Sequence, residues 1–172
     1  MQVVLPTLVI LNLSSICIQT IWHKQLQPMS SCFQKLTKLI VDGCDTLKYL
    51  FSSSMVESLI QLEVLEISNC KFIEAVIITR GERTSNTLFP KLYRLRLKHL
   101  PKLTSFCIFA GNSIELLSLA RLWIENCPKM HTFVYSSPFA DMPASKEETV
   151  NSAEENLQSQ VQALFDEKVF FF

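Results

Sequence analysis

The stretch FPKLYRLRLKHLPKLTSF, residues 89–106, decides the fold of this chain because it holds one complete copy of a spaced apolar pattern. The first apolar position of that copy is Leu92, and the last is Phe106. The same spacing recurs in four other stretches, and the copies begin at Leu8, Leu36, Leu62, Leu92 and Leu119. The copies therefore follow one another at nearly constant intervals. A pattern that returns in this way indicates similar units stacked along one axis.

Within each of the four later copies the apolar residues follow the order Leu-x-x-Leu-x-Leu, then three further apolar positions at intervals of three, whereas the first copy follows this order to Ile16 and continues slightly out of phase with Ile18 and Ile21. The copies contain Leu8, Leu11, Leu13 and Ile16; Leu36, Leu39, Val41, Cys44, Leu47 and Leu50; Leu62, Leu65, Ile67, Cys70, Ile73 and Val76; Leu92, Leu95, Leu97, Leu100, Leu103 and Phe106; and Leu119, Leu122, Ile124, Cys127, Met130 and Phe133. This is the leucine-rich-repeat pattern. It predicts an α/β solenoid, with a short-stranded parallel sheet on the concave face and loops or short helices on the convex face.

The Leu-x-Leu part of each copy has a period of two, which is typical of a strand whose leucines face the interior. We expect strands near 9–13, 37–41, 63–67, 93–97 and 120–124. The segment SSSMVESLIQL (52–62) has serines suited to capping a helix and apolar residues at helical spacing, so we expect a short helix near 54–60. The turns lack an Asn ladder, and we expect Asp42 with Gly43, Asn69 and Asn126 to satisfy their backbone groups.

The periodicity divides the chain into three parts. Residues 4–135 form the predicted repeat domain, with 14 Lys and Arg against nine Asp and Glu. Residues 136–160 are rich in Ser, Glu, Asn and Gln and are predicted to be a disordered acidic spacer. Residues 161–172 regain apolar content and resemble the truncated start of a further repeat. From residue 136 onward, two basic residues stand against seven acidic ones, so a basic repeat region precedes an acidic tail.

Three of the six cysteines, Cys44, Cys70 and Cys127, fall in the same slot of different repeats. Stacked equivalents of this kind favour reduced core thiols over disulfides, which fits the cytosol or the nucleus. The apolar N-terminal stretch lacks a preceding basic residue and falls in phase with the repeats, so we expect neither a signal peptide nor a membrane span.

Catalytic, cofactor and metal chemistry find little support. The chain has three glycines and no Gly-rich phosphate loop, and its histidines are too scattered for a metal site. We therefore expect no enzyme activity, no cofactor and no bound metal.

The residues that flank the inward leucines should point outward from the concave face. On the fourth and fifth strands they place Arg94 and Arg96 beside Arg121 and Trp123. Arg and Trp are enriched at interface hot spots, so this patch predicts a protein-binding surface. A solvated strand face is the plainer alternative, and nucleic acid fits poorly because the patch is short and the chain is neutral overall. The full candidate surface is Lys38, Glu66, Arg94, Arg96, Lys98, Arg121 and Trp123.

The phrases LTKLIVDGCDTLKYLF (36–51), FPKLYRLRLKHLPKLTSF and LWIENCPKMHTF (122–133) resemble the C-terminal repeats of plant disease resistance proteins. These are intracellular immune receptors with a coiled coil, a nucleotide-binding domain and leucine-rich repeats. The resemblance covers about residues 4–135 and implies recognition of pathogen effectors or their host targets, together with autoinhibition of the nucleotide-binding domain. The expected partners are therefore an effector, a guarded host protein or that domain. The sequence holds no nucleotide switch of its own.

Three alternatives remain open at this point. The repeats could serve as the substrate-recognition part of a ubiquitin-ligase adaptor, although no F-box-like segment precedes Leu8. They could belong to a secreted or cell-surface receptor. The chain could also be a truncated receptor fragment without a function of its own.

Overall fold

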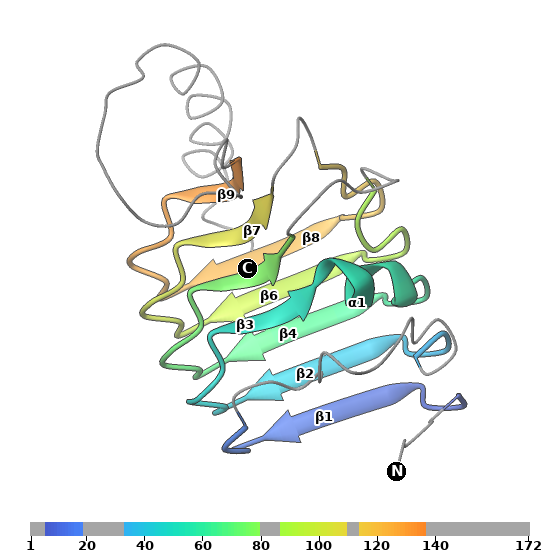
Figure 1. The fold of residues 1–172 in the computed structure, drawn as a ribbon, viewed down its shortest axis with the longest axis horizontal. Helices are drawn as coiled ribbons and strands as arrows, with labels where there is room; N and C mark the ends of the chain where they lie inside the picture. The colour runs from blue at the N-terminus through green and yellow to red at the C-terminus, as the bar shows by residue number, and fades with distance from the viewer. Residues whose placement is uncertain (1–5, 19–32, 80–86, 110–113, 137–172) are drawn as a thin grey trace.

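A computed structural model describes residues 6–18, 33–79, 87–109 and 114–136. The predicted spacer and the predicted start of a further repeat therefore lie outside the described residues, apart from the backbone of Ser136. The elements β1 to β9 and one helix, α1, follow one another along a stack of repeats (Figure 1).

The first sheet consists of the five predicted strands, all parallel. They are β1 (Ile10–Ser14), β2 (Lys38–Asp42), β4 (Val64–Ser68), β6 (Arg94–Lys98) and β8 (Arg121–Glu125), in that order across the sheet. The register aligns the same repeat position on each strand, so that Leu11, Leu39, Leu65, Leu95 and Leu122 lie in one row. The solenoid expected from the periodicity is confirmed.

Each strand begins and ends one residue later than the sequence pattern predicted. The residue before the strand does not join the regular ladder, because its carbonyl accepts two hydrogen bonds from the next repeat. The Val9 carbonyl accepts from the N–H groups of Thr37 and Lys38, at 2.8 and 3.2 Å. The Thr37 carbonyl accepts in the same way from Glu63 and Val64.

A second parallel sheet forms on the return path of the chain. It contains β3 (Tyr49–Ser52), β5 (Ala75–Ile78), β7 (Ser105–Phe109) and β9 (Thr132–Ser136), in that order. The sequence pattern predicts loops or short helices here, whereas the described part of the return path holds this sheet and one helix, α1 (Ser53–Ser58). Ser52 occupies the N-cap position of α1, but its side chain makes no capping hydrogen bond. Figure 1 shows the second sheet and α1 lying over the first sheet.

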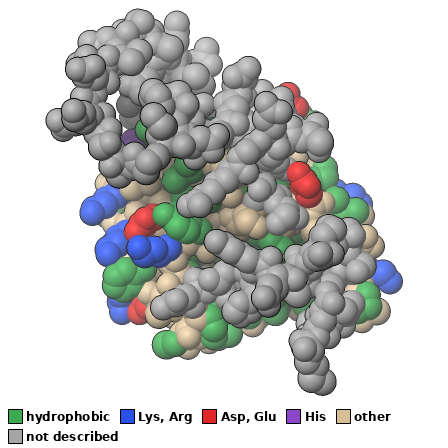
Figure 2. All heavy atoms as spheres, in the orientation of Figure 1, with side chains coloured by type: hydrophobic (Ala, Val, Ile, Leu, Met, Phe, Trp, Pro, Cys, Tyr) green, Lys and Arg blue, Asp and Glu red, His purple; other side chains and the backbone are tan. Residues whose placement is uncertain are grey.

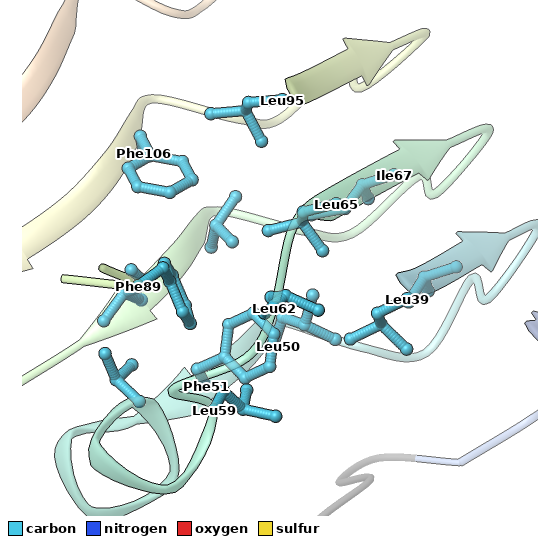
Figure 3. Close-up of a cluster of buried hydrophobic side chains, with 14 of the residues drawn as sticks. Leu39, Leu50, Phe51, Leu59, Leu62, Leu65, Ile67, Phe89, Leu95 and Phe106 are labelled. Atoms are coloured by element: carbon cyan, nitrogen blue, oxygen red, sulfur yellow. The ribbon is translucent and has the colours of Figure 1, made fainter. Parts of the chain in front are cut away.

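The hydrophobic core lies between the two sheets. The inward leucines of the three middle strands, Leu39, Leu65 and Leu95, are fully buried. Aromatic residues close the space from the return path, and Figure 3 shows Phe51, Phe89 and Phe106 among the leucines. The rings of Phe51 and Phe89 meet edge to face, with centroids 5.4 Å apart. Such burial of apolar side chains is the main stabilising contribution to the stack.

The cysteines of the repeat slot are free, as expected. Cys44 and Cys70 are fully buried, Cys127 is half-buried, and none of these three forms a disulfide. The Cys70 thiol donates to the carbonyl of Ser68 at 3.1 Å. Burial raises the pKa of the Cys70 thiol to about 11, so this sulfur stays protonated and behaves as a small core group.

The residue immediately after each strand of the first sheet has a left-handed backbone. Ser15, Gly43, Asn69, His99 and Asn126 all have φ between 53° and 63°. The backbone N–H groups of the first four donate to the last residue of the next strand, as Asn69 does to the Lys98 carbonyl at 3.0 Å. At Gly43 a Cβ would come within 3.2 Å of the Ser15 hydroxyl, so this position has both a conformational and a steric reason to be glycine.

Candidate functional site

The candidate surface lies on the outward face of the first sheet, which we call the open face. Because successive side chains alternate between the two faces of a strand, the first, third and fifth residues of each strand point outward. Register then gives three rows across the sheet. The first row is Ile10, Lys38, Val64, Arg94 and Arg121; the second is Asn12, Ile40, Glu66, Arg96 and Trp123; the third is Ser14, Asp42, Ser68, Lys98 and Glu125.

Two of these rows bring the predicted Arg and Trp residues together on neighbouring strands. Arg94 pairs with Arg121, and Arg96 pairs with Trp123. Adjacent strands lie about 4.8 Å apart, so the four side chains share one small area, which we call the Arg–Trp patch. Arg96 and Arg121 are exposed, and Trp123 is 37% exposed.

Arg94 differs from the other two arginines because it is half-buried. Its guanidinium carbon lies 5.6 Å from the centre of the Tyr93 ring, a cation–π arrangement. Its Nε is buried without a hydrogen-bond partner among the described residues. Within the described part of the chain, none of the three guanidinium groups of the patch lies within ion-pair distance of an acidic side chain.

The remaining predicted residues surround the patch rather than join it. Lys98 is neutralised locally, since its Nζ lies 3.1 Å from a carboxylate oxygen of Glu125 on the next strand. Lys38 stands in the row of Arg94 but two strands away, with Val64 between them. Glu66 is paired with Arg96 in the register and is half-buried. The geometry therefore concentrates unpaired positive charge on β6 and β8.

A second group of polar residues, at the edge where the strands of the first sheet end, was only partly foreseen. The Ser68 hydroxyl and the Asn69 amide donate to the same oxygen of Asp42, at 2.6 and 2.7 Å. These bonds hold the pKa of the Asp42 carboxyl below its ordinary value. The Asn126 amide lies 2.9 Å from Nδ1 of His99 in the next pair of turns.

These contacts correct one expectation. We expected the side chains of Asn69 and Asn126 to satisfy backbone groups, but their described bonds join side chains of neighbouring turns. The backbone groups of the turns are satisfied instead by the N–H to carbonyl bonds between repeats. The sequence signal for these contacts was partial, since Asn69 and Asn126 follow their strands at equivalent places, whereas Asp42 stands one position earlier in its repeat, level with Ser68.

The same edge also carries mixed charges and one aromatic contact. Lys71 forms an ion pair with Asp45 at 2.7 Å, and the Lys102 ammonium lies 4.1 Å from the centre of the exposed Phe72 ring. Figure 2 shows basic side chains alternating with acidic and hydrophobic ones along the edge at which the strands of the first sheet end. Opposite charges are thus already paired here, in contrast to the Arg–Trp patch.

The described residues were also compared with the requirements of a metal site and of a membrane span. Among them, no group of three or more His, Cys, Asp or Glu side chains is arranged to hold a metal ion. No helix in the described part of the chain is long and apolar enough to cross a membrane.

The stacked parallel strands, the repeated apolar slots and the exposed strand face define a leucine-rich-repeat solenoid, a class of protein that presents an extended binding surface. Residues 7–153 match the family described as plant disease resistance protein RPS2-like, leucine-rich repeats, and the chain belongs to this family. It is also 33% identical over 101 residues to the probable disease resistance protein At4g27220 of Arabidopsis thaliana. That match covers 56% of this chain and 11% of the relative's length. No solved structure matches the chain.

Proposed function

We propose that this chain is a non-catalytic protein-interaction module of a plant intracellular immune receptor. In this proposal it recognises a pathogen effector, or the host protein that an effector targets, and it restrains the receptor's nucleotide-binding domain until the ligand arrives. The observation that carries the proposal is the juxtaposition of Arg94 with Arg121 and of Arg96 with Trp123 on the open face. Membership of a disease resistance family supports the immune role.

The chemistry of the Arg–Trp patch favours an acidic protein surface as its partner. A guanidinium group offers five N–H donors in a planar fork that matches a carboxylate, and it also stacks on aromatic rings. None of the three groups forms an ion pair among the described residues, although Glu66 lies opposite Arg96 on the neighbouring strand, so they would attract an acidic partner over a distance of roughly 8–10 Å at physiological salt. Trp123 adds a large apolar contact beside Arg96, as binding hot spots commonly do.

The free thiols support a reducing compartment, which we propose to be the cytosol or the nucleus. We also propose residues 4–135 as the bounds of the repeat domain, because the repeat contacts run from β1 to β9. In a full-length receptor the nucleotide-binding domain would supply the nucleotide switch.

Quantitative affinity capture from leaf extract tests this proposal. The full chain is compared with the variant Arg96→Glu/Arg121→Glu/Trp123→Ala, whose three side chains are exposed, so the fold should persist. The matched control is Lys102→Glu/Lys129→Glu/Phe72→Ala, which changes the same charge and one exposed aromatic ring at the turn edge. Circular dichroism spectra confirm that each variant is folded.

We expect the patch variant to capture at least about tenfold less partner than the parent chain, which corresponds to about 1.4 kcal/mol of binding free energy. The control variant should capture as much partner as the parent chain. Equal capture by the patch variant and the parent chain would show that the Arg–Trp patch does not bind the partner. Capture dominated by the scaffold of a ubiquitin ligase would instead favour the adaptor interpretation.

A further inference from the structure

The described repeats and the tail carry opposite charge, and the difference is concentrated in two places. The Arg–Trp patch holds the guanidinium groups of Arg94, Arg96 and Arg121, which lack acidic partners among the described residues. Residues 141–155, DMPASKEETVNSAEE, hold five acidic side chains and one lysine. We call this stretch the acidic segment.

The lengths of the segments that join the strands in the repeats indicate how far the acidic segment can reach. The segments that join each strand of the second sheet to the next strand of the first sheet are 53–63, 79–93 and 110–120. β9 ends at Ser136, so a return as long as one of these segments ends between positions 147 and 151. Such a return leads to the outer edge of β8, where Arg121 and Trp123 lie. Glu147 and Glu148 are therefore far enough along the chain from β9 to reach the edge of β8.

The edge of β8 is available to receive this segment. No described strand pairs with its outer side, and Figure 1 places β8 and β9 at the same end of the stack. Leu122 is 43% exposed there, whereas its equivalents Leu39, Leu65 and Leu95 are fully buried. Because the segment belongs to the same chain, its effective concentration at the patch is in the millimolar range, so a weak attraction suffices.

We propose that the acidic segment, residues 141–155, docks on the Arg–Trp patch as an intramolecular ligand. An external acidic partner must displace this segment in order to bind. This inference rests on the proposed function, since it gives the same surface an intramolecular competitor. Glu147 and Glu148 provide the charges nearest to Arg121 and Arg96, and Glu154 and Glu155 extend the contact across the open face.

Site-specific photo-cross-linking in the full chain tests the docking. Benzoylphenylalanine replaces Thr149, which lies beside Glu147 and Glu148 and carries no charge itself. After irradiation of the monomer, mass spectrometry maps the joined peptides. We expect cross-links to the peptides of β6 and β8, with a yield that is independent of protein concentration and falls at least about fivefold between about 20 mM and about 500 mM salt.

Two variants make the test specific. Arg96→Glu/Arg121→Glu should abolish these cross-links, whereas Lys102→Glu/Lys129→Glu, an equal charge change at the turn edge, should preserve them. Cross-links that survive both high salt and reversal of the patch, or that map equally to the Lys102 and Lys129 peptides, would overturn the proposal.

The outcome is separable from that of the proposed function. If the cross-links to β6 and β8 are absent while the patch variant still loses its partner, the intramolecular ligand is refuted and the binding surface stands. If the cross-links form as expected while the patch variant captures as much partner as the parent chain, the docking is supported and the proposed binding surface is refuted. A neutral segment, Glu147→Gln/Glu148→Gln/Glu154→Gln/Glu155→Gln, should raise partner capture about threefold or more by removing the competitor.

Discussion

At the scale of single residues, the position after each strand explains much of the chain's turn chemistry. This position has a left-handed backbone in every repeat, yet glycine occupies it once, at Gly43. Elsewhere it holds Ser15, Asn69, His99 and Asn126. Asn tolerates this conformation better than most residues do, and its side chain can bond to the neighbouring turn. Each non-glycine residue there gains such a contact or accepts a small backbone cost.

Asp42 lies at the centre of one such contact and should make stability depend on pH. Hydrogen bonds from Ser68 and Asn69 lower the pKa of its carboxyl in the folded state, so the folded chain binds this proton less readily than the unfolded chain. The contribution is present above the unfolded pKa, near 4, and is lost as the pH falls through the lower folded value.

We expect the free energy of urea unfolding to fall between about pH 5 and about pH 2.5, and to fall less steeply in Asp42→Asn. Asp45, whose pKa is also lowered, here by its hydrogen bond to Lys71, contributes a separate acid dependence that the variant retains. An Asp42→Asn variant with the same acid slope as the parent chain would show that the hydrogen bonds from Ser68 and Asn69 to Asp42 do not stabilise the folded state.

At the scale of elements, the leucine at one repeat position contributes differently to the free energy of unfolding in different repeats. Leu65 on β4 is fully buried between neighbouring strands, whereas Leu122 on β8 is 43% exposed. Both leucines occupy the same row of the first sheet. Because the sequence pattern is the same at both positions, the difference in exposure comes from the place of each repeat in the stack.

We expect Leu65→Ala to lower the free energy of unfolding by about 3–5 kcal/mol, because it leaves a cavity between close-packed leucines. Leu122→Ala should cost about 1 kcal/mol or less, since much of its side chain already contacts water. Denaturant titration measures both values. Equal losses at the two positions would mean that the repeat of β8 is covered as fully as that of β4.

The sequence was sufficient to predict the five strands, the inward leucines and the buried thiols, because each depends on a local pattern that recurs. It did not predict the second sheet. The runs AVII (75–78) and SFCIF (105–109) contain β-branched and aromatic residues typical of strands. Their continuous apolar character lacks the alternation that identifies a half-exposed strand, since Ala75, Val76 and Ile77 are all buried. Pairing between repeats, which a local pattern does not encode, decides their conformation.

The candidate site shows the same limit. Alternation predicted that Arg94, Arg96, Arg121 and Trp123 share a face, and the register places them side by side. It did not predict that Lys98 would be paired with Glu125, because that ion pair depends on the register between two distant segments. It also did not predict the partial burial of Arg94 beside Tyr93. Whether this patch binds a partner remains a prediction.

At the scale of the whole molecule, the described repeats form a continuous stack with an unpaired edge at β1 and another at β8. The stack has paired charges at its turn edge and unpaired positive charge on the open face near β8. The tail that follows β9 is acidic. In our proposals, these features make the open face a binding surface and the acidic tail its competing ligand.

The most direct test of the binding surface places a photo-reactive group within it. Benzoylphenylalanine replaces Trp123 in one version of the full chain and Phe72, an aromatic residue of similar exposure at the turn edge, in another. After irradiation in leaf extract, mass spectrometry identifies the proteins and peptides joined to each position. Our prediction is that position 123 is joined to acidic surface peptides of another protein, and that position 72 is not. Capture of the same proteins with equal yield at both positions would contradict it.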